Sequence, residues 1–71
     1  MQLIFYLSPP QKMKRKPLEF KEVLPLLNYI LQNKQRLIDY KIIMVNFENS
    51  EIVGEMSVKR YLELENEKNG N

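Results

Sequence analysis

Apolar side chains along this chain gather in three short runs and one longer periodic stretch. The first run occupies residues 2–7, where five apolar or aromatic residues follow one another, and Ser8 and two prolines close it. An unbroken apolar run of this length is typical of a β-strand that is buried on both faces. Proline ends the run because it has no N–H to give to a strand ladder. We therefore predict the first strand over residues 2–7.

A periodic apolar pattern predicts a long helix over residues 18–36. Its apolar residues recur at intervals of three and four and form one stripe. They are Phe20, Val23, Leu24, Leu27, Ile30 and Leu31. Pro17 suits the first helical position, but Pro25 in a helix interior would cost about 3 kcal/mol. Two alternatives follow, a helix that bends at Pro25 or one that begins near Glu22.

Two further strands are predicted over residues 40–47 and 52–56, joined as a hairpin by the polar turn 48–51. The apolar residues 42–45 again indicate a strand buried on both faces. Asn49 and Ser50 suit the turn because their side chains can bond to their own backbone. Gly54 indicates a bulge or a close approach of another stretch of backbone.

Residues 57–68 fit two patterns. In a helix, Ser57 would be the N-cap, and Val58, Tyr61 and Leu62 would share a face. In a strand that continues from residue 56, Val58, Leu62 and Leu64 would lie on one side, with Arg60 interrupting the row. Residues 66–71 are polar, and we predict a disordered tail there.

These elements define an α+β fold in which a small three-stranded sheet packs against one long helix. The predicted order is β-α-β-β with a C-terminal helix or strand extension, in a single domain of residues 1–71. The first two strands are expected to be parallel neighbours joined by a right-handed crossover. A core this small rarely contributes more than about 3–5 kcal/mol, and the sheet edges need protection. We therefore expect a homodimer.

The composition excludes most catalytic chemistry. The chain has no His and no Cys, which removes the Ser-His-Asp triad, thiolate nucleophiles and ordinary zinc sites. Glu48, Glu51 and Glu55 carry oxygen ligands that suit a hard cation, but a solvated hairpin end explains their spacing better. We expect no enzyme activity, cofactor, metal or small-molecule substrate.

The net charge of +2 combines two unequal halves. Residues 1–36 hold seven Lys or Arg against two Glu, a net charge of +5, and residues 37–71 hold four against seven acidic residues, a net charge of −3. The densest cations are Lys12, Lys14, Arg15 and Lys16. Three interpretations stay open for this segment: a solvated loop, binding to nucleic-acid phosphates with Tyr6 as a stacking residue, or docking on an acidic protein.

Three tyrosines, Tyr29, Tyr40 and Tyr61, are possible interface residues, because tyrosine combines contact area with a hydrogen bond. Packing at the boundary of the core is the alternative. The first apolar run is short and is followed by cations, unlike a secretory signal. No run approaches the length of about 20 residues that spans a membrane. We expect a cytoplasmic protein without membrane contact.

The strand at 42–45, the strand at 52–56 and the Ser57-x-x-x-Tyr61 start that follows resemble the strand, strand and helix start of prevent-host-death type antitoxins. Those proteins usually have glycine in the turn where this chain has Asn49 and Ser50, and they lack its N-terminal strand and basic loop. The resemblance implies a helix after Ser57 and a small regulator.

The composition, rich in Lys, Asn, Ile and Glu and without Ala or Thr, is typical of an AT-rich genome, such as that of a phage or another mobile element. Taken together, the sequence predicts a small protein-binding or regulatory module that acts as a homodimer on an unknown partner protein. The alternative is a nucleic-acid-binding protein, similar to a small antitoxin or a mobile-element regulator, that uses residues 12–16 on phosphates.

Overall fold

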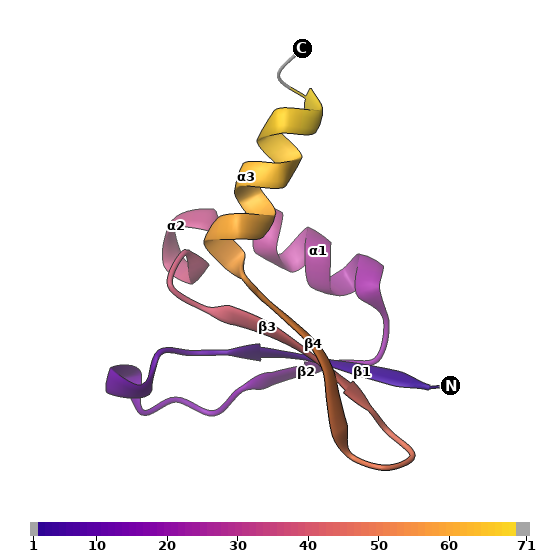
Figure 1. Cartoon of the computed structure of the whole chain (residues 1–71). Helices are drawn as coiled ribbons and strands as arrows, with labels where there is room; N and C mark the ends of the chain where they lie inside the picture. Colours follow the sequence, from indigo (N-terminus) through magenta and orange to yellow (C-terminus); the bar gives the residue numbers. More distant parts are fainter. Residues whose placement is uncertain (1, 70–71) are drawn as a thin grey trace.

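The computed structural model describes residues 2–69 and places three α-helices on one side of a four-stranded antiparallel sheet (Figure 1). The elements are β1 (Leu3–Ser8), the 3-10 helix η1 (Gln11–Met13), β2 (Leu18–Phe20), α1 (Val23–Gln32), α2 (Lys34–Leu37), β3 (Lys41–Asn46), β4 (Glu51–Ser57) and α3 (Val58–Asn69). The strands lie in the order β2-β1-β3-β4. The predicted α+β class is confirmed, with four strands in place of three.

The additional strand, β2, lies inside the segment that the sequence assigned to the long helix. It pairs with β1, so that Phe5 faces Phe20. β1 and β3 are antiparallel, and the predicted parallel crossover is wrong. The reason is that β2 first carries the chain back to the start of β1. The helical layer then crosses the sheet once, so β3 begins beside the end of β1 and must run in the opposite direction.

The segment predicted as one long helix contains two shorter helices after β2. α1 begins at Val23, so Pro25 is its third residue, where the backbone N–H has no helical partner in any case. The alternative of a late helix start is therefore confirmed. Asn33 ends α1, because its side-chain Nδ2 donates to the Tyr29 carbonyl at 2.9 Å and its N–H donates to the Ile30 carbonyl at 3.1 Å.

The substitution Pro25→Ala is expected to leave the free energy of unfolding unchanged or to lower it by about 0.4–1 kcal/mol. At this position proline breaks no hydrogen bond, and its ring restricts the unfolded chain. An interior proline would instead cost about 3 kcal/mol, which alanine would restore. Urea denaturation of the two proteins separates these outcomes. A gain in stability of about 2 kcal/mol or more would contradict a helix start at Val23.

The helical alternative for the segment after Ser57 is also confirmed. The Ser57 Oγ accepts a hydrogen bond of 3.0 Å from the Arg60 N–H and so caps α3. The Val58 N–H donates to the Tyr40 carbonyl at 2.9 Å. Beyond its first turn α3 projects away from the sheet (Figure 1). The tail predicted over residues 66–71 begins within this helix, and residues 70–71 lie outside the described part of the chain.

Gly54 lies beside an irregularity in the hairpin of β3 and β4. Met44 faces Gly54, whereas the next residue of β3, Val45, faces Ile52. Val53 is therefore the extra residue of a bulge, and Ile52 points to the opposite side of the sheet from Gly54. A Cβ on Gly54 would lie 2.5 Å from the Met44 Cε, so this methionine occupies the space above the glycine. The predicted bulge is therefore confirmed, whereas the group that lies close to Gly54 is a side chain and not backbone.

The core lies between the helices and one face of the sheet. Its buried residues come from five of the elements and the turn before β3: Leu7, Leu26, Ile30, Leu37, Tyr40, Ile42 and Val58. Of the predicted helix stripe, Ile30 is buried as expected, but Leu24 is 69% exposed, and the other buried residue of α1 is Leu26, which the stripe did not include. Apolar residues occur on several sides of α1, so spacing alone did not determine which side faces the sheet. Within residues 2–69 no helix has both the length and the apolar content needed to cross a membrane.

Candidate functional site

The second face of the sheet, here called the open face, carries no helix (Figure 1). Strand register identifies its residues, because cross-strand partners point to the same side. Ile4, Val45 and Ile52 form one row, and Tyr6 and Ile43 lie in the next. The central strands β1 and β3 are therefore apolar on both sides, while the described helices cover only one.

Exposure on the open face rises toward β4. Ile4 is 5% exposed, and Ile43 and Val45 are half-buried, whereas Ile52 is 60% exposed. β4 is the last strand of the sheet, so the backbone groups along its outer side have no strand partner in the described chain. Apolar side chains beside a free strand edge are typical of an association site.

Polar groups lie at the margins of the open face. The Tyr6 hydroxyl donates to the Glu19 Oε1 at 3.2 Å. Partial burial raises the pKa of Tyr6 above its usual value, and the Glu19 carboxylate raises it further. At the other margin, the Lys41 Nζ lies 3.7 Å from the Glu55 Oε1. The face thus has an apolar centre with charges of both signs around it.

The four predicted cations lie in the loop between β1 and β2. Lys12, Lys14, Arg15 and Lys16 are all exposed. The loop is folded rather than extended, because the Met13 N–H donates to the Pro10 carbonyl at 3.0 Å and Lys14 adopts a left-handed φ of 51°. The ion pairs of the described chain, Lys41 with Glu55 and Arg60 with Glu63, use none of the four.

The three tyrosines predicted as possible interface residues lie around the core and do not share one surface. Tyr40 is 6% exposed and belongs to the core. The Tyr29 hydroxyl accepts a hydrogen bond of 2.8 Å from Arg36. The Tyr61 hydroxyl donates to Glu65 at 3.2 Å, and burial followed by the charge of Glu65 raises the pKa of Tyr61. These contacts within the chain favour the alternative of boundary packing.

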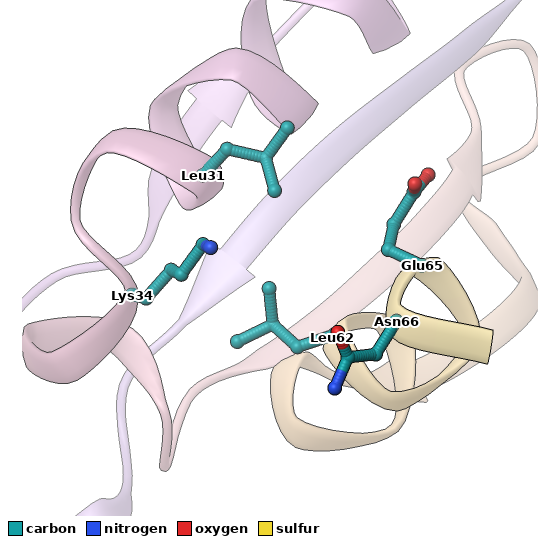
Figure 2. A pocket seen from close by; sticks show the side chains of 5 residues that line it. All are labelled: Leu31, Lys34, Leu62, Glu65 and Asn66. Atoms are coloured by element: carbon teal, nitrogen blue, oxygen red, sulfur yellow. The ribbon is translucent and has the colours of Figure 1, made fainter. Parts of the chain in front are cut away.

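A groove of about 270 Å³ separates the end of α1 from α3. Figure 2 shows Leu31 and Leu62 directed into it from its two sides, with Lys34 beside Leu31. Glu65 and Asn66 of α3 complete the lining. The groove exists because α3 diverges from the helical layer after its first turn, and three of its five lining residues are polar or charged.

The acidic residues of the hairpin are spread out. Glu48 lies in the turn after β3, Glu51 begins β4, and Glu55 pairs with Lys41 on the open face. Within residues 2–69, no three His, Cys, Asp or Glu side chains come together in a way that could hold a metal ion.

The open face is a candidate functional surface that the sequence did not reveal. The apolar runs at residues 2–7 and 42–45 predicted burial on both faces, but no predicted element was assigned to cover the second face. The number of predicted helices could have indicated this face, because one helical layer can cover only one side of a sheet.

Comparison with protein-family models, with curated proteins and with solved structures found no match. The resemblance to prevent-host-death type antitoxins therefore rests on residues 42–62 alone. The functional argument rests on the geometry of the open face and of the basic loop.

Proposed function

We propose that this protein is a small non-enzymatic protein-binding module with a regulatory role, and that it acts as a homodimer joined through its open face. One observation carries the proposal, namely that no described helix covers the apolar side chains of this face. Those that stay partly or largely exposed, around the buried Ile4, are Tyr6, Ile43, Val45 and Ile52. The lack of His and Cys supports the non-enzymatic part, because it removes the commonest catalytic groups.

A second copy of the chain is the partner that suits this surface. A two-fold dimer joins the same patch from both copies, so the patch must be compatible with itself. The open face meets this condition, because its centre is apolar and its margins carry Glu19 on one side and Lys41 with Glu55 on the other. Face-to-face packing would place two sheets about 10 Å apart and bury both apolar faces.

The size of the open face sets the expected affinity. Three strands of six or seven residues and the three-residue β2 fit within roughly 19 Å by 20 Å, which is at most about 400 Å² for each copy. Stable interfaces usually bury about 800 Å² on each partner. We therefore expect a weak dimer with a dissociation constant in the micromolar range or above.

Sedimentation equilibrium from about 10 μM to about 1 mM is expected to show a monomer–dimer equilibrium. Ile52→Lys is expected to abolish it, because the lysine charge lies in water in the monomer and would have to leave water in the dimer. The matched control is Leu24→Lys, since Leu24 is 69% exposed on α1, in the helical layer. A monomer at all concentrations, or equal loss of dimer in the two variants, would contradict the proposal.

A further inference from the structure

We infer that the tip of the β1–β2 hairpin binds the phosphate backbone of duplex nucleic acid. This binding site is separate from the open face, and the inference does not depend on dimer formation. It rests on where the fold places the cations, on their lack of acidic partners, and on the shape of the loop.

The fold brings cations from both halves of the sequence to one end of the sheet. Ser8 faces Lys41, and Lys41 faces Ser57, so the end of β1 lies at the same end as the start of α3. The loop cations follow β1, and Lys59 lies in the first turn of α3. We call this set the basic end, and it consists of Lys12, Lys14, Arg15, Lys16 and Lys59.

Two acidic residues of the second half, Asp39 before β3 and Glu55 near the end of β4, lie at this end of the sheet, and Glu55 pairs with Lys41. The other acidic residues of the second half lie elsewhere. Glu51 faces Asn46, which faces Leu3 at the start of β1, so the acidic turn lies at the opposite end of the sheet. The outer turns of α3, which hold three glutamates, project away from the sheet (Figure 1). Neither described ion pair includes a residue of the basic end.

The backbone that carries the loop cations has a defined conformation. Pro9, Pro10 and Pro17 restrict its two arms, and η1 closes its tip with the hydrogen bond from Met13 to Pro10. A loop that is already folded loses less conformational entropy when it binds a ligand. The backbone positions of the cations are therefore set before any phosphate arrives.

The chemistry of the loop favours phosphates over an acidic protein. Protein interfaces normally have an apolar centre, whereas the only apolar side chain among residues 11–16 is Met13, which is 39% exposed. A duplex is favoured over a single strand, because single strands are bound by stacking on aromatic rings. The nearest aromatic in β1, Tyr6, lies on the open face and bonds to Glu19. A two-stranded β-ribbon also fits the major groove, which is about 12 Å wide.

Fluorescence anisotropy with a labelled duplex of about 20 base pairs, from about 20 mM to about 300 mM NaCl, tests the inference. With four or five phosphates contacted, the logarithm of the affinity is expected to fall against the logarithm of salt with a slope of about −4. The triple variant Lys14→Asn, Arg15→Gln and Lys16→Gln is expected to lose about 2.7 from the magnitude of this slope. At about 100 mM salt its affinity is expected to be on the order of 100-fold lower. Asparagine is chosen at position 14 because it tolerates the left-handed backbone.

The matched control lowers the charge by three units away from the basic end, through Lys21→Glu and Lys68→Gln. Both variants change the net charge from +2 to −1, so a difference between them comes from the position of the charge. The control is expected to bind within about threefold of the unmodified protein. No binding at low salt, or equal loss in the two variants, would overturn the inference. So would tighter binding to a single strand, or displacement of the duplex by polyglutamate at equal charge. Because the readout is binding, it is independent of the sedimentation result.

Discussion

Leu7→Ala is expected to lower the free energy of unfolding by about 2–5 kcal/mol. Leu7 is 0% exposed and lies in a central strand, with Leu18 beside it on β2 and Ile42 beside it on β3. Alanine would leave a cavity between these strands and the helical layer. The loss then includes both the transfer energy of the removed atoms and the cavity left behind.

A loss of this size is comparable with the whole stability of the protein. A domain of 71 residues is stable by roughly 4–11 kcal/mol, and small cores lie at the lower end of that range. Urea denaturation followed by circular dichroism is expected to show the variant partly unfolded before denaturant is added. The control is Leu24→Ala, which removes the same atoms from a side chain that is 69% exposed and is expected to cost less than about 0.5 kcal/mol. Similar losses in the two variants would contradict the assigned core.

Elements with a strong local signal could be predicted from the sequence. Proline ends β1, the polar turn separates β3 from β4, and Ser57 caps α3, because each of these depends on neighbours in the chain. β2 depends on a distant partner instead. Three residues, Leu18, Glu19 and Phe20, fit a helix stripe as well as a strand, and only pairing with β1 decides between them. Because β2 was not predicted, the strand order and the direction of β3 were also predicted wrongly.

The two candidate sites, the basic end and the open face, also differ in how far the sequence alone could predict them. The density of cations at residues 12–16 is visible in the sequence, but only the pairing of β1, β3 and β4 places Lys59 at the same end of the sheet. The open face is harder still to predict from the sequence, because its existence depends on how many helical layers cover the sheet. The apolar runs predicted burial of both faces, but the single described helical layer covers only one of them.

The distribution of charge over the surface depends on the fold and not only on the division of the sequence into a basic and an acidic half. The ion pairs in the described chain are local to the second half, Lys41 with Glu55 and Arg60 with Glu63. The basic loop and the acidic turn lie at opposite ends of the sheet, so the two halves do not neutralise each other there. A net charge of +2 therefore understates the field that a polyanion meets at the basic end.

Tyr40→Ala is expected to lower the free energy of unfolding by about 3–5 kcal/mol, the cost of removing an aromatic ring from a core. This result would separate a core residue from an interface anchor, because an anchor that is exposed in the monomer affects binding and leaves monomer stability almost unchanged. Tyr40 is 6% exposed, and it packs in the core cluster together with Leu37 and Val58. Its carbonyl also accepts the hydrogen bond from the Val58 N–H that holds the start of α3 against β3.

Two further variants make the Tyr40 experiment specific. Tyr40→Phe keeps the ring and removes only the hydroxyl, so it is expected to cost about 1 kcal/mol or less. Tyr29→Ala removes a half-buried ring that contacts Phe20 at 5.8 Å between ring centres and bonds to Arg36, and a smaller loss of about 1–2 kcal/mol is expected. Urea midpoints give all three values. If Tyr40→Ala left the midpoint unchanged but weakened the dimer, Tyr40 would belong to the interface, and the boundary between core and open face would have to be redrawn.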